Sequence, residues 1–216
     1  MRRARGTAAA AAGIAMLALA LAGCGGTVAE PTADEQFAQA EELYFAYREA
    51  TNGVLAVIDD GPWKVEGYGM TPSGAGCGDG WKFDLGRSTA IDPADIPAVR
   101  TAVVDHLTDA GFEVEGMDLG DAENGSEDVI VREQGVYSLL MVTFVADGSV
   151  LVTATTPCTA GDRYALSDRL FGENALPGQG YLPAEESPSD PLFFGITPGQ
   201  PQSSPAGWRS ARPARR

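Results

Sequence analysis

The chain has few of the residues from which many active sites and nucleic-acid interfaces are built. Its 216 residues include one histidine, His106, and this excludes a zinc site with several histidine ligands. Only 15 side chains are basic against 30 that are acidic, and this negative balance argues against a DNA or RNA partner. The apolar run 8–22 covers roughly 15 residues, fewer than the ~20 that a membrane-spanning helix needs.

Known catalytic motifs are missing as well. The chain contains no GxSxG, SxxK or HExxH pattern and no phosphate-binding glycine loop. Its histidine lies beside the expected inner face of a helix, so we interpret His106 as a structural or surface residue. Hydrolysis by a pair of carboxylates stays open, because 30 acids offer many pairs and none stands out. The sequence therefore predicts no catalytic residue, no cofactor and no metal ligand.

The N-terminal segment has the anatomy of a secretory signal, with three arginines, an apolar run and then small residues. The sequence Leu21-Ala22-Gly23-Cys24 matches the lipobox of bacterial lipoproteins at all four positions. An ordinary cleaved signal followed by a chance cysteine is the alternative. In lipoproteins this cysteine becomes the mature N-terminus and carries acyl chains such as palmitate. We therefore expect a lipid anchor on Cys24 and an extracytoplasmic location at the cell membrane.

Two cysteines remain once Cys24 is assigned to lipid. Cys77 and Cys158 would then lie in an oxidising compartment, where an even number of cysteines favours a disulfide. A metal site is the alternative, but neither cysteine belongs to a CxxC motif or lies near the histidine. A redox-active pair would need closer spacing. We predict a structural Cys77–Cys158 disulfide.

Two helices are predicted from their start and stop signals. Thr32 opens a capping box, so the first helix should begin near Ala33, and Asn52-Gly53 should end it. The second helix should end at Gly111. Its inner face would consist of the apolar residues at helical spacing: Ile96, Val99, Val103, Leu107 and Ala110.

Short β segments surround the second helix. Trp81, Phe83 and Leu85 alternate with polar or small residues, as in a half-buried strand. Asp147-Gly148 predicts a tight turn between the last two strands. The expected strands are 63–70, 81–85, 112–119, 129–132, 136–145 and 150–156. This order predicts an α+β fold, a mostly antiparallel sheet of five or six strands with two helices on one face.

Composition divides the chain into four parts: a signal peptide (1–23), a tether (24–33), a disulfide-stapled domain (34–173) and a proline-rich tail (174–216). The tail holds eight of the fourteen prolines, so we predict that it is largely disordered. Its apolar island, 192–196, should dock on its own domain, with a partner as the alternative. Residues 24–198 carry 8 basic and 30 acidic side chains. The tail ends in four arginines (Arg209, Arg212, Arg215, Arg216), which would fold back on the acidic domain, contact anionic envelope polymers or have no role.

The loop 118–128 is dense in oxygen-bearing side chains, as weak calcium sites are. It fails the EF-hand pattern, because Gly125 has the wrong offset from Asp121 and no glutamate ends the loop at position twelve. We interpret it as a solvated acidic turn.

As a whole, the chain resembles the small secreted lipoproteins of actinobacteria, of the LppA-like group. The resemblance covers about residues 1–160. It depends on the lipobox, the Trp81 strand after a cysteine loop, the Ala110-Gly111-Phe112 junction and Thr156-Pro157-Cys158. Since such families are largely uncharacterised, the resemblance implies an envelope location but no catalytic residue.

Three functions are therefore considered. The first is a lipid-anchored extracytoplasmic binding or scaffold domain, attached to the membrane through Cys24, whose partner is an envelope protein, polymer or lipid. The second is a carrier of an apolar envelope molecule, held beside the aromatic stripe Phe37, Tyr44 and Tyr47, although such a stripe more often packs on a sheet. The third is an envelope hydrolase that uses acids alone, and it would need acids with raised pKa values in one cleft.

Overall fold

The computed structural model describes residues 31–120, 125–172 and 183–195. Seven strands form one sheet in the order β3-β4-β5-β6-β2-β1-β7, and every neighbouring pair is antiparallel. In chain order the elements are α1 (Ala33–Ile58), β1 (Trp63–Tyr68), β2 (Asp84–Ala90), the short 3-10 helix η1 (Pro93–Asp95), α2 (Ile96–Asp109), β3 (Glu115–Leu119), β4 (Ser126–Gln134), β5 (Tyr137–Val145), β6 (Ser149–Thr155), α3 (Arg163–Phe171) and β7 (Glu185–Glu186).

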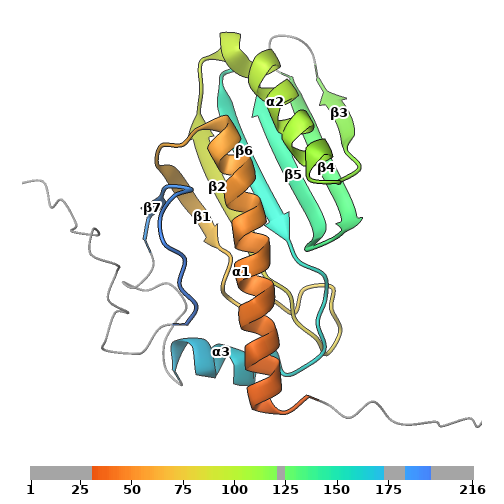
Figure 1. Ribbon diagram of the computed structural model, residues 1–216, viewed down its shortest axis with the longest axis vertical. Coiled ribbons are helices and arrows are strands. Elements are labelled where there is room, and N and C mark those ends of the chain that lie inside the picture. Colours follow the sequence, from red (N-terminus) through yellow and green to blue (C-terminus); the bar gives the residue numbers. More distant parts are fainter. Residues whose placement is uncertain (1–30, 121–124, 173–182, 196–216) are drawn as a thin grey trace, which may run out of the picture.

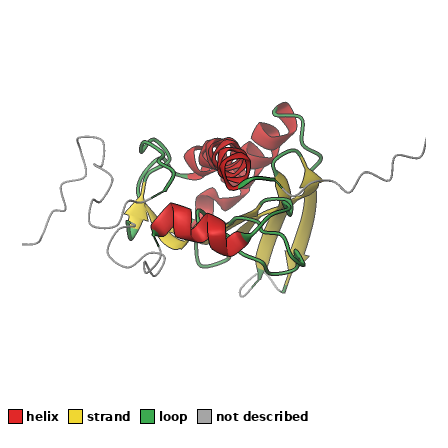
Figure 2. Ribbon diagram, turned by 90° about the horizontal axis from the view of Figure 1, so that it is seen from below, coloured by secondary structure: helices red, strands yellow, loops and turns green. Residues whose placement is uncertain are grey.

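The helices and the sheet form two layers. α1 and α2 lie on the same face of the sheet, and α3 lies at the end of the molecule where α1 begins (Figure 1). Figure 2, seen from below, separates the helical layer from the strands. The core between the layers includes the inner side of β5 and β6, where Leu140, Val142, Val152 and Ala154 are buried. The predicted α+β class and antiparallel sheet are confirmed.

The number of elements exceeds the prediction. The sheet has seven strands rather than five or six, and the described residues include three helices rather than two. α3 was missed although it carries its own start signal, since Asp162 accepts hydrogen bonds from the backbone N–H groups of Tyr164 and Ala165. Its Leu166 and Leu170, four residues apart, are buried. A nine-residue segment offers only this one apolar pair, so its helical period is weak in the sequence.

Helix α1 begins as predicted and ends later than predicted. Thr32 and Glu35 form the capping box, but the helix runs through Asn52 and Gly53 to Ile58. A Cβ atom on Gly53 would lie 3.1 Å from Nε2 of His106, so the glycine allows α2 to pack closely. Interior glycine costs a helix about 1 kcal/mol. Burial of Val54, Leu55 and Ile58 against the core outweighs that cost.

The Trp81–Leu85 segment alternates as expected, but regular strand begins only at Asp84. Trp81 and Phe83 are fully buried and Leu85 nearly so, while Trp81 forms an isolated bridge with Thr159. The predicted turn at Asp147-Gly148 connects β5 to β6, and Gly148 adopts a φ of 93°. A side chain there would collide with the carbonyl oxygen of Ile91. Alternation therefore identified the inward side chains, whereas tertiary pairing decided where the strand begins.

The tail departs from the prediction at residues 183–195, which we call the C-terminal strap. The strap is ordered along the edge of the sheet, where β7 pairs with β1. The 192–195 part of the apolar island lies on its own domain, since Phe193 and Phe194 pack against the core. Ile196 and the arginines of the tail lie outside the described residues. The strap therefore packs on the folded domain, although composition places it in the proline-rich tail.

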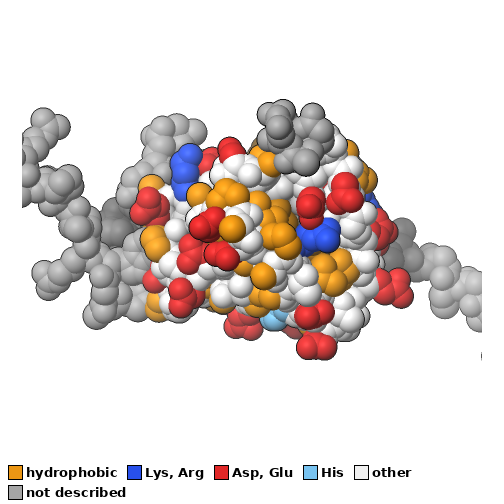
Figure 3. Space-filling view, turned by 90° about the horizontal axis from the view of Figure 1, so that it is seen from above, with side chains coloured by type: hydrophobic (Ala, Val, Ile, Leu, Met, Phe, Trp, Pro, Cys, Tyr) orange, Lys and Arg blue, Asp and Glu red, His pale blue; other side chains and the backbone are white. Residues whose placement is uncertain are grey.

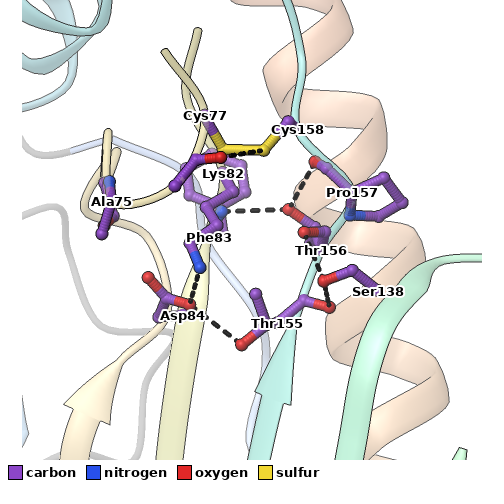
Figure 4. The surroundings of a disulfide bond; sticks show 12 residues. Ala75, Cys77, Lys82, Phe83, Asp84, Ser138, Thr155, Thr156, Pro157 and Cys158 are labelled. Atoms are coloured by element: carbon purple, nitrogen blue, oxygen red, sulfur yellow. Dashed lines mark hydrogen bonds and ion pairs between the residues drawn. A yellow bond between two sulfur atoms is a disulfide. The ribbon is translucent and has the colours of Figure 1, made fainter. Parts of the chain in front are cut away.

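The Cys77–Cys158 disulfide is present, with a Cα–Cα distance of 5.4 Å and a sequence separation of 81. It joins the loop before β2 to the loop after β6 (Figure 4). Two hydrogen bonds beside the disulfide join the same two segments. Thr156 Oγ1 accepts from the Phe83 N–H, and Thr155 Oγ1 donates to Asp84. The prediction of a disulfide-stapled domain is confirmed.

None of the helices in the described part of the chain is long and apolar enough to cross a membrane.

Removing the disulfide should lower the free energy of unfolding substantially. For a loop of this length the chain-entropy model assigns about 4–5 kcal/mol to the cross-link. We expect the double variant Cys77→Ser/Cys158→Ser to lose about that amount in urea unfolding. Reductant should bring the wild type down to the same stability and leave the variant unchanged. A wild type that keeps its midpoint in reductant would contradict a stabilising role.

Candidate functional site

The aromatic stripe on α1 is part of the core. Tyr44 and Tyr47 are fully buried, and both rings pack against Phe83 with centroids 6.0 Å apart. Phe37 packs against Phe194 of the strap, at 5.2 Å between centroids. The three cavities described below are lined by none of the three stripe residues. The space where a carrier would hold its ligand is therefore filled here by side chains of the chain itself.

His106 lies at the contact between α1 and α2, half-buried beside Gly53. Its position fits the structural interpretation made from the sequence.

The acidic loop is described only in part, since residues 121–124 lie outside the described residues. At its two ends, Glu127 pairs with Arg100 at 3.0 Å and Asp118 lies 4.0 Å from the same guanidinium. Within the ranges that the structure describes, no group of three or more His, Cys, Asp or Glu side chains is arranged to hold a metal ion. Asp118 and Glu127 of this loop therefore contact a cation of the chain itself.

Three carboxyl groups have lowered pKa values, which is the opposite of what a general acid requires. Hydrogen bonds from Thr32 lower the pKa of Glu35, and those from Lys64 and Ser88 lower that of Glu66. The Ser149 backbone N–H lowers the pKa of Asp147. All three carboxyls are exposed, and a general acid needs the opposite shift.

The most unusual group in the core is a buried cluster of three charged side chains. Arg48 of α1, Arg87 of β2 and Glu186 of the strap are exposed by 1%, 0% and 6%. One carboxylate oxygen of Glu186 accepts from Arg48 at 2.5 Å and from Nε and an Nη of Arg87 at 2.8 and 2.6 Å. Burying such charges costs several kcal/mol each unless they are paired. The strap therefore supplies the one counter-charge in this cluster.

The cluster holds two positive charges against one negative, and neutral dipoles complete its solvation. The guanidinium groups donate to the backbone carbonyl oxygens of Gly67, Gly86 and Tyr68 at 2.6–3.3 Å. Arg48 also donates to the Tyr44 hydroxyl at 3.1 Å and lies over the Tyr68 ring, 5.5 Å from its centroid. Nε of Arg48 is buried without a partner among the described residues.

Further contacts hold the rest of the strap. The Asn52 amide donates to the Pro188 carbonyl oxygen at 3.1 Å, and the Val65 N–H donates to the Ala184 oxygen at 2.9 Å. Phe194 packs on Tyr44 with ring centroids 5.1 Å apart. The strap is thus attached to α1 and β1 through charge, backbone pairing and aromatic packing together.

Between α1 and the strap lies an open groove of about 560 Å³, which we call the α1–strap groove. Its walls are Phe45, Glu49, Asn52 and Gly53 from α1 and Pro188, Asp190 and Leu192 from the strap. Asn52 is 9% exposed, and its Oδ1 is buried without a hydrogen-bond partner among the described residues. Because the Asn52 nitrogen faces the Pro188 oxygen, the amide orientation is set and Oδ1 is left as an unfilled acceptor. The groove is our candidate binding site.

Two other cavities are weaker candidates. One, of about 620 Å³, lies where α1 and α3 begin, and two of its polar side chains are already paired: Gln36 with the Asp162 carbonyl oxygen, and Arg163 with Tyr164. The other, of about 400 Å³, lies between α2 and β3 and borders residues outside the described ranges.

Sequence reasoning missed the cluster and the groove, although part of the signal was present. Arg48 lies four residues after Tyr44, and Arg87 two after Leu85, so both fall on inward-facing positions. A buried arginine needs a carboxylate. Which of 30 acids supplies it depends on the path of the strap, and no local pattern gives that path. Cys24, the predicted lipidation site, lies outside the described residues.

Comparisons of the chain with protein-family models, with curated proteins and with solved structures found no match. What the site binds is therefore inferred from its own geometry and chemistry. The resemblance to LppA-like lipoproteins stays a prediction from the residues that suggested it.

Glu186→Gln should destabilise the protein by about 3–5 kcal/mol, because it leaves two buried guanidinium groups without a counter-charge. The matched control is Glu185→Gln, since Glu185 is the exposed neighbour in the same strand. It should change stability by less than about 0.5 kcal/mol. Urea unfolding measures both, and hydrogen exchange should show faster exchange at Glu186–Asp190 in the first variant alone. Equal behaviour of the two variants would refute the role of the cluster.

Stability should fall steeply in alkali. Burial raises the pKa of Tyr137 to about 12 and also raises the pKa values of Tyr44, Tyr47 and Tyr68. An unfolded tyrosine ionises near pH 10. The contribution of each buried neutral tyrosine to the free energy of unfolding is therefore complete below pH 10 and is lost above it. For Tyr137 the loss ends near pH 12, at about 1.4 kcal/mol per pH unit. Tyr137→Phe should make the decline shallower in pH-dependent unfolding, whereas Tyr164→Phe, at an exposed ring, should not.

Proposed function

We propose that this chain is a lipid-anchored, extracytoplasmic binding domain of the bacterial cell envelope. The anchoring part of the proposal is supported by Leu21-Ala22-Gly23-Cys24 after an apolar run. The Cys77–Cys158 disulfide supports it further, because disulfides persist in oxidising compartments outside the cytoplasm. It also uses two of the three cysteines and leaves Cys24 at the lipobox position as the third.

The observation that carries the binding part is the α1–strap groove, whose lining includes Asn52, a side chain with a buried Oδ1 that no described residue partners. Its side chains offer carboxylate and amide oxygens beside the apolar surfaces of Phe45 and Leu192. No nucleophile paired with a base is among these lining residues, so we propose recognition rather than catalysis.

The position of the groove along α1 suits a partner away from the membrane. Cys24 precedes Ala33 by nine residues, which span at most about 30 Å when extended. Along α1, Phe45 lies twelve residues beyond Ala33, or about 18 Å at 1.5 Å per residue. The acidic surface would repel anionic headgroups (Figure 3). We therefore propose a protein or polymer of the envelope as the partner, rather than the bilayer surface.

Cys24→Ala should release the protein from the membrane, since lipid on this residue is its proposed attachment. The measurement is fractionation of the native host, with incorporation of an alkyne-labelled palmitate analogue as a second readout. The control is Cys77→Ser/Cys158→Ser, which removes the other two cysteines and should leave any folded protein in the membrane fraction, labelled. An unlabelled wild type, or a Cys24→Ala protein that stays with membranes, would overturn the anchor.

A further inference from the structure

The α1–strap groove has the chemistry of a site for a cation that donates hydrogen bonds. Three of its lining side chains carry oxygen acceptors: Glu49, Asn52 and Asp190. Glu49 forms no ion pair within the described ranges, and one oxygen of Asp190 accepts from the Ser187 N–H at 2.6 Å. The Oδ1 of Asn52 is buried and has no hydrogen-bond partner in the part of the chain that the structure describes. A guanidinium group, with five N–H donors and no acceptor, matches this set.

The walls of the groove suit the rest of an arginine side chain. Phe45 and Leu192 are half-buried, so each keeps apolar surface against which an alkyl stem can pack. A guanidinium also stacks favourably on an aromatic ring such as that of Phe45. The two arginines of the buried cluster do not occupy the groove, because Arg48 and Arg87 are buried and already bound to Glu186.

The surroundings of the groove add long-range attraction for positive charge. The exposed face of α1 carries Glu41, Glu42 and Glu49, and the last turn of α1 contains no basic residue, while Asp59 and Asp60 follow it. These acids make the electrostatic potential around the groove negative, so a cation bound there is favoured.

We infer that the α1–strap groove binds arginine side chains, and that its occupant is the arginine-bearing segment 208–216 of this same chain. The segment carries four arginines and no acid, whereas residues 24–198 carry 8 basic and 30 acidic side chains. From Gly195, the last described residue of the strap, fourteen residues lead to Arg209, a reach of up to about 45–50 Å. A tethered segment has a millimolar effective concentration at such a distance.

This inference rests on the proposed function for its choice of groove, and it adds the ligand chemistry and a resident occupant. A basic segment of an envelope partner would then enter the groove by displacing residues 208–216. Both segments would use the same acceptors, so competition in the intact chain lowers the apparent affinity of the partner below its intrinsic affinity.

The test uses the full secreted chain with Cys24→Ala and a dye-labelled synthetic peptide of residues 208–216. Two versions of the full chain are compared. One keeps the arginines of its tail, and the other carries Arg→Gln at 209, 212, 215 and 216. We expect the peptide to bind the Arg→Gln chain at least tenfold more tightly by fluorescence anisotropy, because its groove is vacated. Outside residues 208–216 themselves, amide NMR shifts between the two chains should be confined to Phe45–Gly53 and Ser189–Leu192, and salt should weaken peptide binding.

A matched pair of charge variants separates the groove from general attraction. In the Arg→Gln chain, Glu49→Gln/Asp190→Asn removes two acids that line the groove, while Glu41→Gln/Glu42→Gln removes two exposed acids of α1 that do not. The first pair should weaken peptide binding at least tenfold and the second less than threefold. Equal losses would overturn the groove as the site. Equal affinity of the two tail versions would overturn the segment as its occupant, and neither result would alter the outcome of the Cys24→Ala experiment on anchoring.

Discussion

The ion pairs of Glu186 with Arg48 and Arg87 are the interaction on which the rest of this structure depends. They join three parts of the chain that are far apart in sequence: the middle of α1, strand β2 and the C-terminal strap. Two buried guanidinium groups would be too costly without a carboxylate, and water does not reach them to replace it. The strap is therefore part of the fold, although composition assigns it to a proline-rich tail.

Fixing the strap also covers the edge of the sheet and creates the groove. β7 pairs with the start of β1, which would otherwise present unpaired backbone groups. The stretch that follows Glu186 then runs beside α1, where Pro188, Asp190 and Leu192 become one wall of the α1–strap groove. The ion cluster and one wall of the proposed binding groove are thus consecutive parts of one segment.

Because basic residues are scarce, the surface of the domain is negatively charged. Of the eight basic side chains in residues 24–198, two, Arg48 and Arg87, are buried in the core. Arg100 forms an ion pair with Glu127 at the end of the acidic loop, and Arg169 forms one with Asp34 in the first turn of α1. Within the described ranges, the exposed acids of α1 beyond its first turn form no ion pair, so a basic ligand would complement the charge of this face.

Local signals in the sequence determined the class of the fold, the capping box at Thr32, the inward side chains of Trp81, Phe83 and Leu85 and the Cys77–Cys158 pair, because each depends on spacing or on counting. Longer-range contacts decided the remainder. Helix α1 continues past Asn52-Gly53 because burial of Val54, Leu55 and Ile58 outweighs a local stop signal. Glu186 becomes the partner of two arginines because the strap returns to the sheet 99 residues after Arg87, and no local pattern encodes such a return.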